Sequence, residues 1–544
     1  MNDLQFISSI SPIGDLLVKG AAEHPGRDAI VFPESRRTYG ELLQGAIRVT
    51  RGLLAQGVRP RDNVGILLGN SVDFVEAFFG ISLLGCVVVP LNARHKATEL
   101  GFIIANADMT ALVTNSEAGG YVDFAEVIAT ALPSLHSARG GELALPEAPK
   151  LRRIILLKGG GRNAFVSREE FDRAADTVEE TVVDELRYRV RVRDTAVIIY
   201  TSGTTANPKG CMLSHEAMTR GAITRAKWRF QTGERKVHWG GGPLFHIGSL
   251  APFIGTIGSG GTYLTDAFFD PGRALALMER ERATMAWPWF PAIVQGLLDH
   301  PGFDAARLDS LRSIMLIGPP PLIKRIQKLF PNAEVMQACG MTETAGIFAL
   351  SDIAEGAESR ALTHGRAARG VEVRIRKIDG DGDAATDEVG EILVRGYCLM
   401  NGYYQDPLKT AEALDEEGWL HTGDLYSRSQ DGSLVFNGRL KDMLKVGGEN
   451  VAAIEVEAFL CEHPAVRLAE VVGRPDAALD EVPVAFVELR PGHQVTSDQI
   501  IEFCKGRIAS YKIPRAVYFV NPDEWPMSAT KVNKRELRSR LTAS

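Results

Sequence analysis

The sequence predicts an α/β protein in which a largely parallel sheet is covered by helices on both faces. Several apolar runs of strand length lack the polar alternation of a half-exposed strand, and helical stretches separate them. Both features are typical of doubly wound sheets, whose strands are buried on both faces. The apolar runs are residues 63–68, 86–89, 111–114, 154–157 and 196–199.

Helical segments are expected between these strands. A helix-like opening begins at Ser11 and leads through the β-branched piece 29–32 to a helix start at 38–42. A further helix is expected over 72–84, between two of the buried strands. This order of elements again indicates a covered parallel sheet.

The chain is long enough for two domains, because its 544 residues exceed what one core normally holds. A large N-terminal domain of doubly wound sheets is predicted over 1–439, with a small β-rich subdomain around the strand-like stretch 391–395. Later elements are shorter and more charged. Residues 440–544 are therefore predicted to fold as a small α+β domain, with a helix at 455–460 and a strand at 483–487.

Composition indicates an ordinary soluble globular protein, with 45% hydrophobic and 24% charged residues. The formal net charge of −7 argues against a nucleic-acid partner. The apolar stretches 77–91 and 240–265 are too short, or too broken by glycine and proline, to predict an integral membrane segment. Six scattered cysteines without metal-ligand spacing favour the cytoplasm, and a homodimer is the default expectation.

The most informative stretch follows the last buried strand. Residues 200–210 read Tyr-Thr-Ser-Gly-Thr-Thr-Ala-Asn-Pro-Lys-Gly. Hydroxyls, accessible backbone N–H groups and one lysine are what a polyphosphate needs, because its oxygens accept many hydrogen bonds at close range. The Walker pattern fails, since Pro208 precedes Lys209 and Gly210 follows it. A surface loop without chemistry is the alternative interpretation of this stretch by itself.

Together with four later stretches, this loop resembles the phosphate-binding signature of the adenylate-forming enzymes. That superfamily includes acyl-CoA synthetases, peptide-synthetase adenylation domains and firefly-type luciferases, and the acyl-CoA synthetases are the most similar. The usual signature has glycine where this chain has Ala206. The resemblance implies that ATP phosphates bind to Thr201, Ser202, Gly203, Thr204, Thr205 and Lys209.

The stretch 339–344 is the second signature. A carboxylate flanked by hydroxyls near a phosphate loop suits Mg²⁺, although a helix N-terminus capped by Thr342 is an equally good interpretation of these residues alone. The resemblance implies that Glu343, with Thr204, holds the metal. Family members commonly stack an aromatic side chain on adenine where this chain has Cys339. The nucleotide-binding residues implied here are Gly318, Cys339, Gly340, Met341 and Thr342.

Two further signatures contain Asp424 and Arg439. A carboxylate that accepts both ribose hydroxyls, beside an arginine, would fix the nucleoside and leave the phosphates free to react. As bare residues, the two could form a surface ion pair. Lys441 lies where related enzymes hinge, so the resemblance implies a mobile C-terminal domain.

The C-terminal domain would supply the remaining groups. The resemblance implies that Gly447, Gly448 and Glu449 line the channel for coenzyme A, and that Lys531 reaches the carboxylate and the α-phosphate. Lys534 is a near alternative for that lysine. Without the other motifs, these basic residues would be a solvated tail.

The acid would bind in a largely apolar pocket. No placed arginine or lysine selects a dicarboxylate, so the acyl group is expected to be uncharged and the acid to be a medium-chain fatty, alicyclic or aromatic one. His246 alone would more often be a structural histidine, and core packing is an equally good explanation for each apolar residue. The implied pocket residues are Trp228, His246, Ile247, Gly248, Trp287 and Gly318, with Phe230, Trp289 and Phe290 as further candidates.

The resemblance implies a two-step ligase that uses ATP, Mg²⁺ and coenzyme A. A carboxylic acid attacks the α-phosphorus of ATP, pyrophosphate leaves, and a thiol then takes the acyl group from AMP. Glu343, Thr204 and Lys531 are the implied catalytic residues. An adenylation enzyme that loads a separate carrier protein, a luciferase-like oxygenase and a non-catalytic nucleotide-binding homologue are the alternatives.

Overall fold

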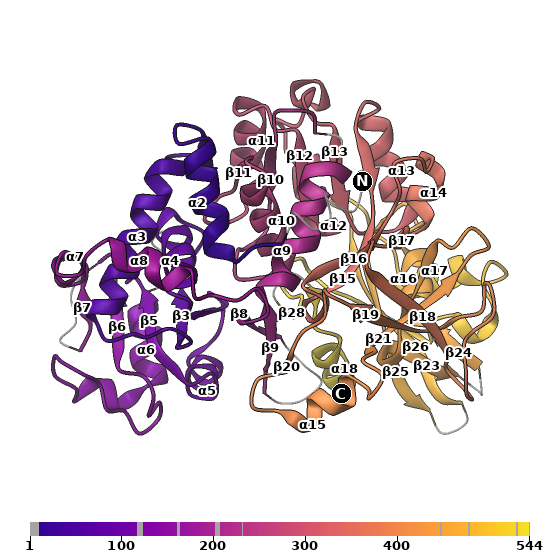
Figure 1. Cartoon of the computed structure of the whole chain (residues 1–544). Helices are drawn as coiled ribbons and strands as arrows, with labels where there is room; N and C mark the ends of the chain where they lie inside the picture. Colours follow the sequence, from indigo (N-terminus) through magenta and orange to yellow (C-terminus); the bar gives the residue numbers. More distant parts are fainter. Residues whose placement is uncertain are drawn as a thin grey trace. The chain divides into compact units, whose positions relative to one another are not determined.

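The computed structural model describes residues 10–116, 123–159, 164–201, 207–230, 232–446, 449–476, 479–528 and 531–542. The chain forms two compact units (Figure 1). The first consists of Met1–Glu372 and Arg395–Gly418, and the second of Val373–Val394 and Trp419–Ser544. The predicted boundary near residue 440 stays a prediction.

The first sheet of unit 1 has eight strands, in the order β20-β9-β8-β4-β3-β5-β6-β7. The strands from β8 to β7 are parallel, whereas β9 and β20 are antiparallel additions at one edge. All five predicted apolar runs form strands of this sheet. The bounds are β3 (Asn63–Leu67), β4 (Val87–Pro90), β5 (Met109–Thr114), β6 (Arg153–Leu156), β7 (Val166–Ser167), β8 (Thr195–Thr201), β9 (Lys209–Ser214) and β20 (Gly402–Tyr403).

Some helices around this sheet begin at a side-chain cap. The hydroxyl of Thr38 accepts the Glu41 N–H while the Glu41 carboxylate accepts the Thr38 N–H, so the chain enters its longest helix here through a capping box. The hydroxyl of Ser71 caps the predicted helix over 72–84 by accepting the Phe74 N–H. These helices are α2 (Ile13–Glu23), α3 (Tyr39–Ala55), α4 (Val72–Leu83), α5 (Ala97–Asn106), α6 (Phe124–Ala131), η1 (Pro133–His136), α7 (Arg168–Ala175) and α8 (Thr181–Arg187).

The second sheet of unit 1 has seven strands, in the order β14-β13-β12-β10-β11-β1-β2, and only the edge strand β2 is antiparallel. Successive side chains of a strand point to opposite faces. Ala286 accordingly packs in one core and its neighbours Met285 and Trp287 in another. The strands are β1 (Asp28–Val31), β2 (Arg36–Thr38), β10 (Val237–Gly240), β11 (Thr262–Leu264), β12 (Met285–Trp289), β13 (Ser313–Leu316) and β14 (Glu334–Met336).

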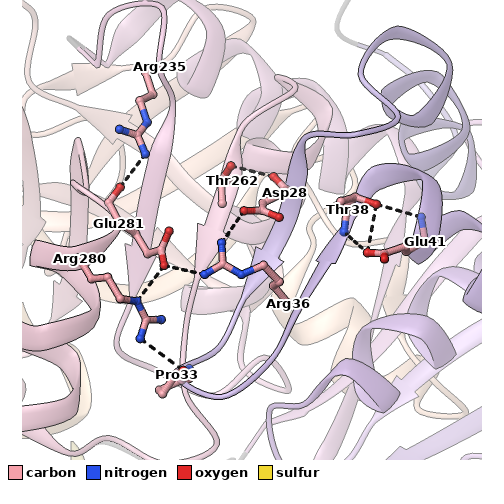
Figure 2. Close-up of polar contacts among 9 residues, drawn as sticks. All are labelled: Asp28, Pro33, Arg36, Thr38, Glu41, Arg235, Thr262, Arg280 and Glu281. Carbon is pink, nitrogen blue, oxygen red and sulfur yellow. Dashed lines mark hydrogen bonds and ion pairs between the residues drawn. The ribbon is translucent and has the colours of Figure 1, made fainter.

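Ion pairs fix the edge of the second sheet (Figure 2). The guanidinium of Arg36 contacts Asp28 at 2.8 Å and Glu281 at 3.0 Å, and Glu281 also accepts from Arg280 at 2.9 Å. Arg36 is half exposed, so each pair contributes little free energy. Their role is to hold β2 next to the end of α11 (Pro271–Arg280).

A third sheet in unit 1 has three strands, β15 (Ala338–Met341), β16 (Gly346–Leu350) and β17 (Arg366–Ala367). The turn η4 (Thr342–Thr344) joins the first two strands. Among the described helices, none combines the length and apolar character needed to cross a membrane. The other helices are α9 (His215–Thr224), the π-helical turn η2 (Arg225–Arg229), α10 (Ile247–Gly258), α12 (Pro291–Asp299), η3 (Ala305–Leu308), α13 (Pro320–Leu329), α14 (Ala357–Leu362) and α15 (Pro407–Ala413).

Unit 2 contains two principal sheets. The four-stranded sheet has the order β18-β19-β21-β22, and the five-stranded sheet has the order β24-β23-β26-β25 with β27 beside β26. The strand predicted at 391–395 is β19, and the helix and strand predicted at 455–460 and 483–487 are α16 and β26. The bounds are β18 (Val371–Lys377), β19 (Gly390–Gly396), β21 (Leu420–Arg428), β22 (Leu434–Arg439), η5 (Leu440–Asp442), β23 (Met443–Val446), β24 (Glu449–Ala452), α16 (Ala453–Leu460), β25 (Val466–Asp476), β26 (Asp480–Leu489), α17 (Ser497–Cys504), η6 (Ser510–Lys512), β27 (Ala516–Phe519), β28 (Met527–Ser528), β29 (Lys531–Val532) and α18 (Lys534–Thr542).

Candidate active site

The predicted phosphate loop is the connection of a β-hairpin. Strand β8 ends at Thr201 and β9 begins at Lys209, and these two residues are register partners in an antiparallel pair. The two strands therefore hold the ends of the loop on one edge of the first sheet. The loop residues Ser202, Gly203, Thr204 and Thr205 lie outside the described residues.

Glu343, the predicted metal ligand, is held by a residue that the sequence did not single out. Glu343 is 8% exposed, and its Oε1 accepts a 2.9 Å hydrogen bond from the hydroxyl of Tyr403. The Met400 N–H donates to the Glu343 carbonyl at 2.9 Å. Tyr403 lies on β20, directly opposite Cys211 of β9. The hairpin that carries the loop and the turn that carries Glu343 are thus joined through one side chain.

Lys209 completes this contact chain. Its ammonium lies 4.2 Å from the centre of the Tyr403 ring, a cation–π contact. Burial and the neighbouring Glu343 charge raise the pKa of Tyr403 well above its usual value. The hydroxyl therefore keeps its proton and donates to Glu343 at any physiological pH. We call Lys209, Tyr403 and Glu343 the Glu343 contact chain.

The turn around Glu343 is a short 3₁₀ segment. The hydroxyl that accepts the Met341 N–H, at 3.1 Å, belongs to Thr344 and not to Thr342, so the capping interpretation of Thr342 is wrong. The Thr344 hydroxyl also donates to the Gly346 carbonyl at 2.7 Å. Ala345 has a φ of 49°, a left-handed conformation that lets the chain reverse into β16. The tight reversal leaves the Glu343 side chain at the tip of the hairpin.

Neighbouring residues constrain two of the predicted nucleotide-binding residues, Gly340 and Gly318. A Cβ on Gly340 would lie 2.5 Å from the Gly346 carbonyl oxygen, so only glycine fits between β15 and β16. The Gly318 N–H donates to the amide oxygen of Gln337 at 3.2 Å. Cys339 is buried on β15, opposite Ala349. Contact of any of these residues with a nucleotide stays a prediction.

The predicted acyl residues 246–248 lie at the start of α10. His246 caps this helix, because its Nδ1 accepts the Gly248 N–H at 3.2 Å. A Cβ on Gly248 would lie 3.7 Å from Nε1 of Trp289, and a Cβ on Gly346 would lie 3.9 Å from Ile247. The segment is therefore between the indole of Trp289 and the turn that carries Glu343.

Aromatic rings dominate the neighbouring core. The rings of Phe230 and Trp287 meet edge to face at 5.1 Å, and Trp287 and Trp289 are 5.3 Å apart. Trp289 has a left-handed φ of 60°, where the register of β12 with β13 shifts. Trp228 lies half-buried in η2, with the Lys227 ammonium 5.6 Å from its ring. The rest of this aromatic cluster consists of Met285, Met315, Met336, Ala338 and Ile347, with Phe290, Ile317 and Leu350 packed against it.

In unit 2, Asp424 and Arg439 form an ion pair, which is what one interpretation of these two residues alone predicted. They are register partners on β21 and β22, and Nε of Arg439 lies 3.0 Å from Oδ1 of Asp424. Glu391 positions this segment, since it accepts the Gly423 N–H at 2.9 Å and contacts Nδ1 of His421 at 3.1 Å. Glu391 was not predicted, because its partners lie about thirty residues away in the sequence.

The predicted hinge and coenzyme A residues are only partly described. Lys441 lies in η5, whose next residue, Asp442, accepts from Arg538 at 3.0 Å. Gly447 and Gly448 lie outside the described residues, and of Glu449 only the backbone, the first residue of β24, is described. Lys531 pairs through its backbone with Ser528 in a two-stranded ribbon, and its side chain lies outside the description.

Lys534, the alternative catalytic lysine, is occupied. Its ammonium contacts Oε1 of Glu457 and lies 3.5 Å from Oε2 of Glu470, largely out of solvent. Although burial lowers the pKa of Lys534, the two carboxylates outweigh this and raise it. A lysine held by two carboxylates is poorly placed to stabilise a reacting phosphate. The contact supports Lys531 as the catalytic lysine.

Comparison with known proteins decides the family. Residues 17–404 match the model of the AMP-binding enzyme, and residues 455–531 match that of the AMP-binding enzyme C-terminal domain. The chain belongs to the AMP-binding enzyme family. The predicted superfamily and α/β fold class are confirmed.

Members of the AMP-binding enzyme family that are similar to this chain are named acyl-CoA ligases. A (methyl-dioxo-octahydro-indenyl)propanoyl:CoA ligase of Mycobacterium tuberculosis is 33% identical over 99% of this chain and 99% of its own. The mitochondrial medium-chain acyl-CoA ligase ACSF2 of Homo sapiens is 29% identical over 97% of this chain and 87% of its own. These matches confirm the predicted enzyme class, an AMP-forming acid–thiol ligase.

A solved structure agrees with this assignment. The anthranilate CoA ligase AuaEII in complex with anthranoyl-AMP has a TM-score of 0.82 and 25% identity to this chain, and covers 98% of both chains. The roles of the individual site residues stay predictions.

Proposed function

We propose that this protein is an ATP-dependent acyl-CoA synthetase that activates a carboxylic acid with an uncharged acyl group as acyl-AMP and transfers the acyl group to coenzyme A. The observation that carries the proposal is the Glu343 contact chain, which fixes Glu343 next to the hairpin of the phosphate loop. The family match supports the reaction type.

In the first half-reaction, the acid's carboxylate attacks the α-phosphorus of ATP and expels pyrophosphate. Thr201 to Thr205 and Lys209 bind the phosphates, and Lys531 stabilises the charge that develops at the α-phosphate. Glu343 and Thr204 would hold Mg²⁺, which would neutralise phosphate charge when bound. One fixed carboxylate fits this ion, since Mg²⁺ usually takes one or two carboxylates together with phosphate oxygens.

Two groups of residues bind the nucleoside. Gly318, Cys339, Gly340, Met341 and Thr342 border the adenine, and Asp424 and Arg439 bind the ribose. The pairing of Arg439 with Asp424 supports this role, because it orients the carboxylate that follows Gly423, a residue of β21 with a φ of 69°.

In the second half-reaction, a coenzyme A thiol attacks the acyl carbon and AMP leaves. The part of the chain after Lys441 turns, Lys531 withdraws, and Gly447, Gly448 and Glu449 line the thiol's path. Transfer to a carrier protein is the alternative second step.

The acid is medium-chain, alicyclic or aromatic. The aromatic cluster around Trp287 next to Ile247 supports an apolar acyl group. The names of the relatives support it too, since they specify medium-chain acyl groups and a propanoyl chain on a fused ring. The cytoplasm is the proposed location, in keeping with six free cysteines, and a homodimer is the proposed assembly.

The experiment is mass-spectrometric detection of products from the purified protein with ATP, Mg²⁺, coenzyme A and a panel of acids. Acyl-CoA and AMP support the proposal. Acyl-AMP and pyrophosphate without a thioester would indicate the carrier-protein alternative. No product with any acid, despite ATP binding in calorimetry, would indicate a non-catalytic homologue.

A further inference from the structure

Two tryptophans of the aromatic cluster carry unused hydrogen-bond donors. Trp287 is 3% exposed and Trp289 is 8% exposed, yet within the described part of the chain neither indole N–H has a hydrogen-bond partner. Buried indole N–H groups normally find an acceptor. Trp525 in unit 2 shows the usual arrangement, because its Nε1 donates to Glu488 at 2.7 Å.

An unpartnered donor in a core is unfavourable, since the group loses its hydrogen bond to water and gains none. A phenylalanine would supply the same kind of ring without this loss. The cluster already contains such rings, Phe230 and Phe290, packed with the two tryptophans. Simple packing therefore does not account for the choice of tryptophan at both positions.

The donor of Trp289 lies next to the segment assigned to the acyl group. A Cβ on Gly248 would be 3.7 Å from Nε1 of Trp289 and 3.3 Å from Nδ1 of His246. The one lone pair of that imidazole nitrogen is already used by the Gly248 N–H. His246 is thus close to Trp289 without serving as its acceptor.

Trp287 lies on the same side of the second sheet. Met285, Trp287 and Trp289 are alternate residues of β12 and share the aromatic cluster, whereas Ala286 packs in the core on the opposite face. The other members of the cluster are aliphatic, sulfur-containing or phenyl side chains. A bridging water would need two to four polar partners, and these side chains offer its protons nothing stronger than the weak thioether acceptors of methionine.

We propose that the acid carries an acceptor oxygen on its apolar body, remote from the carboxylate, which accepts a hydrogen bond from Trp289 or Trp287. A ketone, ester or ring ether has this chemistry. The inference rests on the proposed function and narrows its substrate from a plain hydrocarbon acid to an oxo-substituted one. A bare alkyl or cycloalkyl acid leaves both donors buried and unpaired, so it binds less well.

Matched acids test this inference. The kcat/KM for acyl-CoA formation is measured with 3-cyclohexylpropanoic acid and with its 2-, 3- and 4-oxocyclohexyl analogues. We expect one oxo acid to be favoured by roughly ten-fold or more, the range for a buried donor that gains its partner. Trp289→Phe and Trp287→Phe keep an aromatic, though smaller, ring and remove the N–H, and at least one should lower this ratio towards one. Equal use of all four acids by the natural protein would overturn the inference.

A binding measurement separates this failure from failure of the proposed function. The protein has six tryptophans, so indole ¹⁵N labelling gives few resonances, and Trp289→Phe and Trp287→Phe assign two of them. A non-hydrolysable sulfamoyl-adenosine analogue of the preferred oxo acid should move one of the two N–H resonances downfield, and the cyclohexyl analogue should not. The Trp525 resonance, already paired with Glu488, is the internal control.

The two failures then differ in their results. Thioester formation without the oxo preference and without the resonance shift overturns the acceptor and leaves the synthetase proposal standing. Absence of thioester and acyl-AMP with every acid overturns the synthetase proposal. If no product forms and neither indole resonance moves with any oxo analogue, the inference of an acceptor oxygen on the acid is overturned as well.

Discussion

The hydroxyl of Tyr403 donates a 2.9 Å hydrogen bond to Oε1 of Glu343, across sixty residues of sequence. Its ring receives the Lys209 ammonium on one face. One side chain thereby sets the position of the proposed metal ligand relative to the strand that follows the phosphate loop. Such outer contacts orient metal ligands and strongly affect metal binding.

Removing the Tyr403 hydroxyl should weaken Mg²⁺-dependent adenylation. For Tyr403→Phe we expect pyrophosphate release to need about ten-fold more Mg²⁺, or its rate at fixed Mg²⁺ to fall about 10- to 100-fold, because the Glu343 carboxylate loses its orienting donor. The control is Tyr404→Phe, since the Tyr404 hydroxyl bonds instead to Asp108 at 3.3 Å. Equal Mg²⁺ titrations for both variants would contradict the positioning role.

Lys531 should act in only one half-reaction. Lys531→Ala is expected to slow acyl-AMP formation by roughly 10²–10³, the range for losing one preorganised donor, while thiolysis of supplied acyl-AMP survives. The measurement is single-turnover kinetics of each half-reaction. Lys505→Ala, which removes an exposed lysine of the same unit, is the control. Equal losses of rate in both half-reactions, with an unchanged melting temperature, would show that Lys531 does not act in acyl-AMP formation alone.

Lys534 should matter for stability rather than chemistry. Lys534→Met leaves the Glu457 carboxylate with little solvent and without its cation, and we expect a loss of about 3 kcal/mol in the free energy of unfolding. Lys512→Met removes the more exposed pair with Glu455 and should cost less than about 1 kcal/mol. Urea unfolding of both variants checks this. A stable Lys534→Met that fails only in adenylation would reverse the roles of the two lysines.

The same cluster predicts a pH dependence of stability. Burial, with the charge of Glu457, raises the pKa of Glu470 to about 8. A raised carboxyl pKa means that the folded state binds the proton more tightly than the unfolded state. This contribution is full below the ordinary pKa of a glutamate and is lost as the pH rises to about 8. Unfolding midpoints between pH 5 and pH 8.5 should therefore fall more for the natural protein than for Glu470→Gln, and parallel curves would refute the assignment.

Local sequence signals predicted much of the fold. The five uninterrupted apolar runs became β3, β4, β5, β6 and β8, because buried parallel strands need no polar alternation. The helix start at 38–42 carries its own signal, a threonine followed by a glutamate three residues later.

The residues that orient the site were not predictable in this way. Tyr403 and Glu391 act on Glu343 and Gly423 across long stretches of sequence, and nothing near either residue marks it. The left-handed backbone conformation of Trp289 was equally unpredictable from the sequence, because a tryptophan does not indicate a positive φ. Such partners come together when the chain folds.

The path of the acid's oxygen tests the central proposal most directly. The protein is supplied with ATP, Mg²⁺, coenzyme A and an acid labelled with ¹⁸O in both carboxylate oxygens, and the products are weighed by mass spectrometry. If the carboxylate attacks the α-phosphorus and the thiol then displaces AMP, one ¹⁸O appears in AMP and one stays in the thioester. Label in inorganic phosphate, or thioester formation with unlabelled AMP, would contradict the adenylate mechanism.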